Sequence, residues 1–233
     1  MHCAIGIDVG GTKIAGGLVD LDNGHVRERQ EIPTLPARGG SVVLDDAVAL
    51  AARLVRHGQD AGMDPVGIGV GVAELVDAQG RVTSHQTIGW DTLPVQARFG
   101  NLLPAVVESD VRAAALAEAR YGAGRAYHQF VYVTVGTGIS HTLVLDGRPF
   151  AGAHGNALIF ASGTLALQCP HCGQPVSHVL EEYASGPALV RRYNEVSGET
   201  AQDGQAVITA AANREPAAVT VVSSAGEALG VGV

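Results

Sequence analysis

The chain has 233 residues, of which 46% are hydrophobic and 16% are charged. This length and composition favour a globular protein with one large or two small domains and exclude a disordered chain. The net charge is −8 and no basic patch is visible, which argues against a nucleic-acid-binding surface.

Apolar runs separated by glycine turns predict three strands at the start of the chain. Asn23-Gly24 is typical of a hairpin turn before the third of them. Residues 41–58 follow with apolar side chains at helical spacing, which predicts an amphipathic helix. The three expected strands are 3–9, 14–20 and 26–32.

The middle of the chain continues with strands and one helix, and this order indicates the α/β class. We expect a boundary between two lobes near Asp110, which gives lobes of residues 1–109 and 110–233. The expected elements are strands at 66–72, 106–109, 130–135 and 142–145, turns at 76–82 and 136–140, and a helix at 111–121.

A glycine turn joins the first two expected strands in the string Asp8-Val9-Gly10-Gly11-Thr12-Lys13. It is neither a dinucleotide fingerprint nor a P-loop, because both of those open a helix. Gly10 and Gly11 let the backbone approach a cluster of charged oxygens. Thr12 can donate a hydrogen bond to phosphate, Lys13 can neutralise it, and Asp8 can hold a metal-bound water. A plain tight hairpin is the alternative.

A second glycine turn, Gly136-Thr137-Gly138, also joins two strands. Two such turns in two lobes resemble the actin-like ATPase and hexokinase fold, and the details resemble the ROK family (repressor, open reading frame, kinase) of sugar kinases. The resembling pieces, in family order, are Ile7 to Lys13, Gly69-Val70-Gly71, Gly89-Trp90, Ser109 to Glu118, Gly122-Ala123-Gly124, Gly136 to Ile139, Asp146-Gly147-Arg148 and Leu180 to Gly186.

The resemblance implies ATP-dependent phosphorylation of a sugar hydroxyl, with Mg²⁺ on the phosphates and Asp110 as the catalytic base. A carboxylate within hydrogen-bond reach can take the proton of a weakly nucleophilic hydroxyl as the phosphoryl group moves. Asp110 also precedes a helix and could serve as its N-cap, and the two roles are compatible. The substrate positions that the resemblance implies are Gln86, Ser109, Asp110 and Glu181.

Several of these positions depart from the family's sugar-contacting residue types. Ser109 and Gln86 stand where the family has Asn, Ile159 replaces a carboxylate, and Ser162 replaces a His. When a site loses a polar group that binds a sugar hydroxyl, its selectivity for that sugar falls by a large factor. We therefore expect glucose to be a poor ligand. The resemblance and its departures together predict either a kinase that phosphorylates a sugar or a sugar analogue such as a cyclitol, or a catalytically impaired member that binds a ligand or a partner.

The string Cys169-Pro170-His171-Cys172-Gly173 has the spacing of a zinc knuckle. The family completes this site with a His and a third Cys, which are Ser162 and Val179 here. A zinc site needs four ligands. The ligands predicted for a rewired site are Cys169, Cys172 and His178. His171 could take the place of His178, and His154 is a more distant candidate for the fourth ligand. A relic loop without zinc is the alternative.

Features that the sequence lacks lead to expectations about the location of the protein and its domains. Three cysteines suggest no disulfide framework, and no leader or apolar stretch of about 20 residues is visible, which predicts a cytoplasmic protein without a membrane span. The chain opens directly on the first turn's strand, without the helix-turn-helix arm of ROK repressors. It ends before the family's closing elements, so we expect an incomplete second lobe. A homodimer is also expected.

Overall fold

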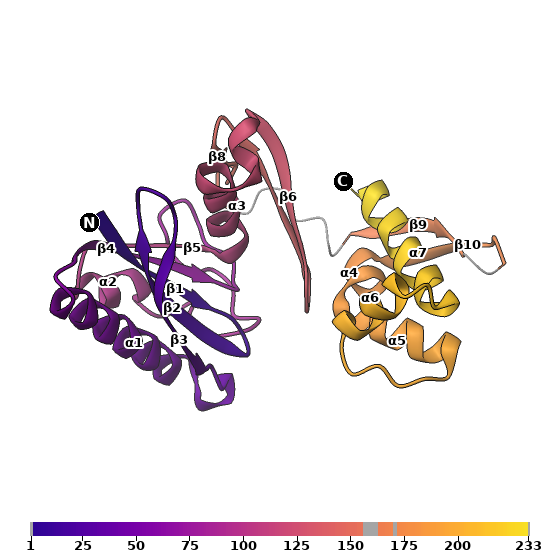
Figure 1. Cartoon of the computed structure of the whole chain (residues 1–233), viewed down its shortest axis with the longest axis horizontal. Coiled ribbons are helices and arrows are strands. Elements are labelled where there is room, and N and C mark those ends of the chain that lie inside the picture. The colour runs from indigo at the N-terminus through magenta and orange to yellow at the C-terminus, as the bar shows by residue number, and fades with distance from the viewer. Residues whose placement is uncertain (1, 156–162, 170–171, 233) are drawn as a thin grey trace. The chain divides into compact units, whose positions relative to one another are not determined.

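The computed structural model describes residues 2–155, 163–169 and 172–232. The chain divides into two compact units, each with its own apolar core (Figure 1). Unit 1 comprises Met1–Phe130 and Thr142–Ala157, and unit 2 comprises Val131–His141 and Leu158–Val233. This division differs from the predicted boundary at Asp110. The helix that begins there packs on strands of unit 1 and so belongs to that unit.

A five-stranded mixed sheet forms the body of unit 1, in the order β3-β2-β1-β4-β5. The strands are β1 (His2–Val9), β2 (Lys13–Asp20), β3 (Val26–Pro33), β4 (Asp64–Val72) and β5 (Ala105–Ser109). β1 pairs antiparallel with β2 and parallel with β4, which in turn pairs parallel with β5. The carboxyl ends of three parallel strands therefore meet at one edge, where ligands of α/β proteins commonly bind.

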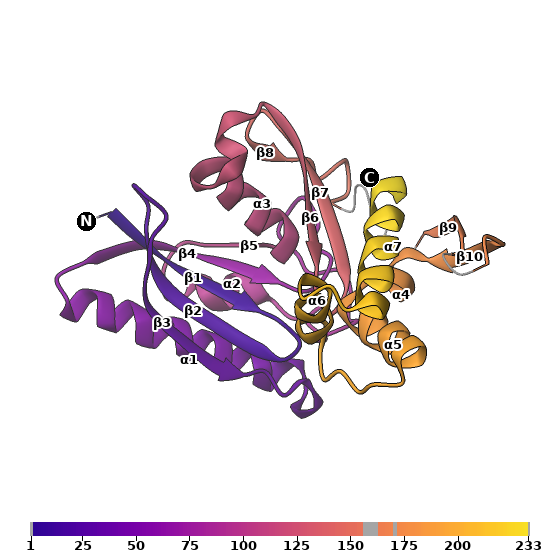
Figure 2. The same ribbon diagram turned by 45° about the vertical axis from the view of Figure 1, so that its right-hand side comes forward.

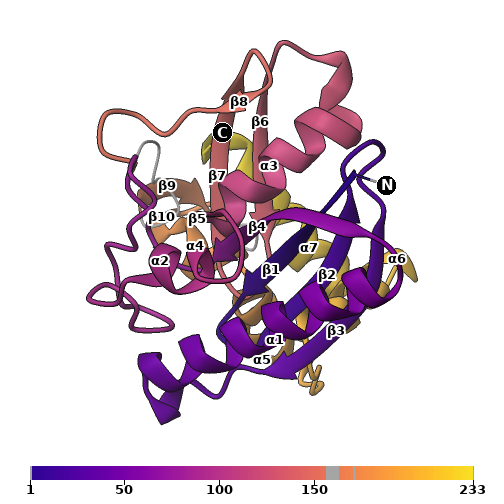
Figure 3. The same cartoon turned by 90° about the vertical axis from the view of Figure 1, so that its left-hand side faces the viewer.

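Two helices cover opposite faces of this sheet (Figure 3): α1 (Gly40–Asp60) and α3 (Asp110–Tyr121). Alternate residues of a strand point to opposite faces. Val70 of β4 lies in the buried core that α1 covers. A Cβ added to its neighbour Gly71 would lie 3.8 Å from the Cβ of Ala113 on α3. The shorter elements of the unit are η1 (Pro36–Arg38), α2 (Val95–Gly100), η2 (Ala123–Ala126) and β8 (Arg148–Pro149).

The second glycine turn lies between β6 (Gln129–Val135) and β7 (Ile139–Leu145), which form a three-stranded sheet with β8. The division between the units falls within both strands. Unit 2 continues with the hairpin of β9 (Thr164–Gln168) and β10 (Pro175–Val179). Its helices gather around one core (Figure 2). They are α4 (Leu180–Ala184), α5 (Gly186–Ser197), α6 (Gly204–Ala212) and α7 (Pro216–Gly232).

A half-buried arginine links three helices of unit 2. The guanidinium of Arg192 stacks over the ring of Tyr183 at 3.7 Å and donates a hydrogen bond of 3.0 Å to the Tyr183 carbonyl. It also donates to the hydroxyl of Ser224 on α7 at 2.5 Å. This contact links α4, α5 and α7 through a single side chain.

The expected strands and helices from residue 3 to residue 145 all occur, with ends shifted by three residues or fewer. The expected turn at 76–82 is a small hairpin closed by an isolated bridge between Val76 and Val82. No described helix is both long and apolar enough to cross a membrane.

Candidate active site

The first glycine turn is closed by its own backbone and supported from β3. The Gly10 N–H donates to the carbonyl of Lys13 at 3.0 Å. Thr34, just after β3, donates its hydroxyl to the Gly10 carbonyl at 2.6 Å and its N–H to the Thr12 carbonyl at 3.0 Å. The turn is thus held in one shape at the end of β1, as the sequence predicts.

The side chain of Lys13 lies beside a carboxylate on the neighbouring strand. Its Nζ donates to Glu31 Oε1 at 3.1 Å, and Arg29 donates to the same oxygen at 2.6 Å. These hydrogen bonds, first from Lys13 and then from Arg29, lower the pKa of Glu31. The Lys13 side chain is 54% exposed, and exposed ion pairs are weak, so it is available to an incoming phosphate.

Asp8 and Asp110 lie on either side of one glycine at the edge where the parallel strands end. A Cβ added to Gly71 would lie 3.8 Å from Asp8 Oδ1 and 3.7 Å from the Cα of Asp110. Burial raises the pKa of Asp8, which Lys13 and Arg29 partly offset. Burial also raises the pKa of Asp110, and the charge of Asp8 adds to this increase, while the N–H of Val111 opposes it. Paired carboxylates with raised pKa values are typical of functional sites.

Asp110 is the first residue of α3, and Ser109 occupies the N-cap position. The hypothesis that Asp110 is the N-cap is therefore wrong by one residue, although its Oδ1 accepts the Val111 N–H at 2.7 Å and so holds the helix start. The Ser109 hydroxyl is buried and has no hydrogen-bond partner among the described residues. An unpaired buried hydroxyl at a predicted substrate position fits a missing polar ligand.

Arg112, which sequence analysis did not single out as a functional residue, fixes the start of α3. Its side chain is buried and donates to the carboxylate of Glu108, to the Val76 carbonyl at 2.7 Å and to the Gly155 carbonyl. Glu108 Oε1 also accepts the Ser109 N–H at 2.8 Å. Through this ion pair and two hydrogen bonds to carbonyls, the Arg112 side chain therefore connects the end of β5, the start of α3 and two loops.

Glu74 was also missed, and it organises the segment that contains Gln86. Its side chain is 7% exposed and lies two residues beyond the end of β4. Burial alone raises its pKa, but hydrogen bonds from the Ser84 hydroxyl and from the N–H groups of Ile88, Thr87 and Gln86 outweigh burial and lower it. A buried, ionised carboxylate with several donors indicates a fixed local structure.

The second glycine turn lies in unit 2 and is supported by two residues that follow it in sequence. Gly136 N–H donates to the Gly138 carbonyl at 2.9 Å, and Gly186 N–H donates to the Gly136 carbonyl at 2.8 Å. Glu181 Oε2 accepts the N–H of Ile139 at 2.7 Å. Glu181, predicted as a substrate contact, thus braces the turn that contains Thr137. Its Oε2 thus accepts the first backbone N–H of β7, directly after the turn.

The zinc prediction falls partly outside the described residues, which omit His171 along with Ile159 and Ser162. In the β9–β10 hairpin, His178 pairs with Leu165 and Gln168 pairs with Pro175, so His178 lies three residues along the strand from the hairpin's end. That is about 10 Å of strand. The His178 ring instead lies 4.8 Å from the Tyr183 ring.

Cys169 and Cys172 belong to the loop of that hairpin, and neither forms a disulfide. No group of three potential metal ligands occurs among the described residues. The described side chains therefore do not fit a zinc ion held by Cys169, Cys172 and His178 together. Zinc binding stays a prediction from the sequence.

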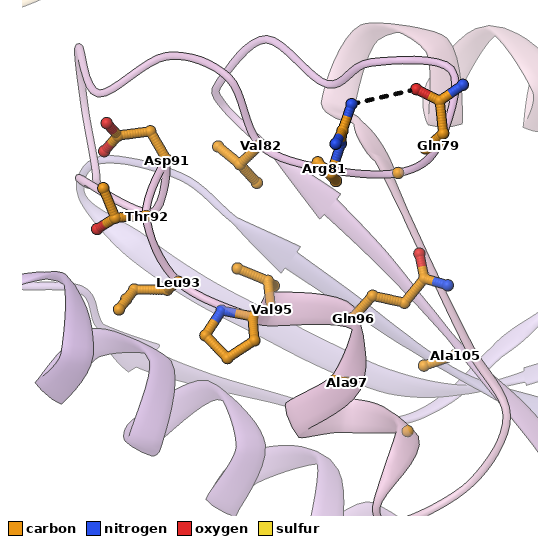
Figure 4. A pocket seen from close by; sticks show the side chains of 13 residues that line it. Gln79, Arg81, Val82, Asp91, Thr92, Leu93, Val95, Gln96, Ala97 and Ala105 are labelled. Atoms are coloured by element: carbon orange, nitrogen blue, oxygen red, sulfur yellow. Dashed lines mark hydrogen bonds between the residues drawn. The ribbon is translucent and has the colours of Figure 1, made fainter.

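Unit 1 also contains an open pocket of about 700 Å³ between the 76–82 hairpin and α2 (Figure 4). Its polar lining includes Arg81, Asp91 and Gln96. Arg81 is already paired with Asp77 at 2.7 Å. None of the predicted catalytic, phosphate or substrate residues lines this pocket, so the pocket is not part of the predicted site.

The chain belongs to the ROK family, whose model matches residues 4–233. It is 33% identical over 213 residues to a glucokinase of Streptomyces coelicolor, a match that covers 89% of this chain and 64% of that glucokinase. The chain thus spans slightly less than two thirds of the length of that relative.

Solved structures show the same fold. A ROK family glucokinase from Streptomyces griseus, in complex with glucose and AMPPNP, matches with a TM-score of 0.79 and 28% identity, over 99% of this chain and 77% of that one. A ROK hexokinase from Thermus thermophilus matches with a TM-score of 0.74 and 29% identity, over 99% of this chain and 76% of that one. The predicted hexokinase-like α/β fold is confirmed.

Proposed function

We propose that this chain is an ATP-dependent kinase that phosphorylates a hydroxyl of a sugar or of a sugar-like cyclitol. The observation that carries the proposal is the juxtaposition of Asp8 and Asp110 at the strand edge that also holds the Gly10-Gly11 turn. The similarity to glucokinases, one of them in complex with AMPPNP, supports ATP as the donor.

The roles follow from the chemistry of each group. The turn at Gly10 and Gly11, with Thr12 and Lys13, binds phosphate oxygens, and in unit 2 the turn at 136–138 does the same. Mg²⁺, when bound, supplies charge neutralisation on the phosphates. Asp8 fits a hard cation because its carboxylate lies beside that of Asp110, where two like charges need compensation.

Asp110 is the base that accepts the proton of the acceptor hydroxyl. Burial raises its pKa, so the carboxylate is a stronger base than an exposed Asp. The start of α3 holds this carboxylate in place through the Val111 N–H. On the acceptor side, Ser109 of unit 1 offers a buried hydroxyl without a partner among the described residues, and Gln86 is a second proposed contact in the same unit. Glu181 of unit 2 is a proposed acceptor contact on the family resemblance alone. A homodimer and a cytoplasmic location also remain proposals.

Calorimetry with Mg-ATP tests the nucleotide site. We expect the 233-residue chain to bind Mg-ATP with a Kd between about 10 μM and 1 mM, the range of ordinary enzyme substrates. Lys13→Met removes the cation of the first turn and should weaken binding about tenfold, or roughly 1.4 kcal/mol. The control Arg56→Met removes an exposed cation from α1 and should change nothing. A chain that releases no heat with Mg-ATP would instead support the impaired, ligand-binding alternative.

We expect glucose to be a poor acceptor. Ser109 and Gln86 replace the Asn side chains implied by the family resemblance, and a short hydroxyl reaches fewer sugar oxygens than an amide. Titration of glucose and of a cyclitol such as myo-inositol, each with AMPPNP present, measures the difference. Glucose binding at 1 mM or tighter, about −4 kcal/mol, would refute the expectation.

A further inference from the structure

One buried carboxylate collects four hydrogen bonds from a single segment of unit 1. Glu74 Oε1 accepts the N–H groups of Thr87 at 2.6 Å and Ile88 at 2.8 Å. Its Oε2 accepts the N–H of Gln86 at 3.1 Å and the hydroxyl of Ser84. Three successive backbone N–H groups thus point at one side chain, and the segment 84–88 takes its shape from Glu74.

This segment contacts the first glycine turn. A Cβ added to Gly11 would lie only 2.7 Å from Cγ2 of Thr87, which is closer than such atoms approach in proteins. Thr87 therefore covers Gly11, and the same backbone that Glu74 holds also carries Gln86, whose side chain is exposed. Glu74, which lies two residues after β4, therefore holds the backbone of both Thr87, which lies against Gly11, and Gln86, a proposed acceptor contact.

The far end of the segment is anchored independently. Trp90, the single tryptophan of the chain, is fully buried and donates its Nε1–H to the Gly40 carbonyl at 2.9 Å. At the near end, the Leu75 N–H donates to the Ser84 hydroxyl at 2.8 Å. The segment is fixed at both ends, and Glu74 fixes its middle.

We propose that Glu74 is a positioning residue, which holds the segment 84–88 so that Thr87 closes on the Gly10-Gly11 turn and Gln86 faces the acceptor. Glu74 itself contacts neither phosphate nor acceptor. The role in catalysis rests on the proposed kinase function, whereas the hold of Glu74 on the segment rests on the contacts alone.

The first test replaces the carboxylate. Glu74→Ala leaves three N–H groups without their acceptor, and we expect a red shift of Trp90 emission, with KM for ATP and for the acceptor raised about 10- to 100-fold by misplacement of the segment. Glu74→Gln keeps one acceptor oxygen, so its Trp90 emission and both of its KM values should lie between those of the parent and those of Glu74→Ala. If Glu74→Ala does not fold, Glu74→Gln provides the test. The matched control is Asp77→Asn, which removes a carboxylate that accepts the N–H groups of Gln79 and Arg81 in the neighbouring hairpin.

Asp77→Asn should leave the emission and both KM values unchanged. If a folded Glu74 variant keeps the parent's KM values, or if Asp77→Asn changes them equally, Glu74 has no positioning role. If the parent itself neither binds nor uses ATP, the kinase proposal fails, and Trp90 emission alone then decides whether Glu74 holds the segment.

The second test rebuilds the contact between Thr87 and Gly11. Gly11→Ala introduces the Cβ that meets Cγ2 of Thr87, so we expect Mg-ATP affinity to fall about tenfold as the turn or its cover shifts. The double variant Gly11→Ala/Thr87→Ser lacks the Cγ2 methyl of Thr87, so it should recover most of the affinity for Mg-ATP. If Gly11→Ala binds Mg-ATP as the parent does, or if the double variant is no better than the single one, Thr87 does not cover the turn.

Discussion

Asp110→Asn should lower kcat by about 10²- to 10⁴-fold, the usual contribution of a general base. The amide has nearly the same shape and keeps an oxygen for the Val111 N–H, so the start of α3 stays intact, but it cannot accept the hydroxyl proton. The dissociation constant for Mg-ATP should change little, because the lost interaction forms only in the transition state.

The pH profile gives a second measure of the same residue. The base must be ionised, so kcat in the parent should fall as pH drops through the pKa of Asp110, and burial places that limb above the ordinary value of 3.8. Asp110→Asn should remove this limb. Asp146→Asn, a change at an exposed turn, should keep the parent's kcat and profile. If Asp110→Asn transfers phosphate at the parent's rate, Asp110 only supports the helix.

Arg112→Met should destabilise unit 1 by about 3 kcal/mol. The change leaves the carbonyls of Val76 and Gly155 without their donor and removes the partner of Glu108. Glu108 is 38% exposed, so water offsets part of its loss. Urea unfolding followed by Trp90 fluorescence reports unit 1 alone, because Trp90 is the only tryptophan and lies in that unit's core.

The matched control is Arg98→Met, which removes an ion pair of Arg98 with Asp45 on the surface of the same unit. Exposed pairs contribute about 0–1 kcal/mol, so this variant should unfold close to the parent. Equal destabilisation by the two changes would show that the buried contacts of Arg112 contribute no more than an exposed ion pair. A kcat loss in Arg112→Met at temperatures where it stays folded would further link the contacts of Arg112 to the placement of Asp110.

The local pattern of the sequence was sufficient for the five strands of the large sheet in unit 1 and for α1 and α3, but not for the shorter elements α2, η1, η2 and β8. Apolar runs predict β1 and β2, and the Gly10-Gly11 string predicts the turn between them, because both signals act over a few residues. The helical spacing at 41–58 predicts α1 for the same reason. The parallel ends of β1, β4 and β5 then bring Asp8 and Asp110 to one edge, as the family resemblance implies.

The residues that hold the site in shape could not be found in this way. Glu74 acts on residues 10 to 14 positions away, and Arg112 acts on Val76 and Gly155, at distances of 36 and 43 positions. No short motif marks such contacts, because they depend on how loops fold back on one another. An acidic residue two positions after a buried strand was the one available signal for Glu74.

Glu181 was predicted from the sequence, but only one of its contacts was. The family resemblance points to Glu181 as a substrate contact, and the structure adds a hydrogen bond from the N–H of Ile139, the residue that follows the second glycine turn. A residue can serve both purposes, since one carboxylate oxygen accepts from the turn and the other can face a ligand. Only the tertiary structure reveals the second contact.

Phosphorus NMR of the chain with Mg-ATP and a panel of sugars and cyclitols tests the kinase proposal most directly. We predict the appearance of ADP together with a new phosphomonoester signal for at least one acceptor, at a rate that Asp110→Asn abolishes. A chain that binds Mg-ATP but leaves it intact with every acceptor, or that yields only free phosphate, would contradict the proposal.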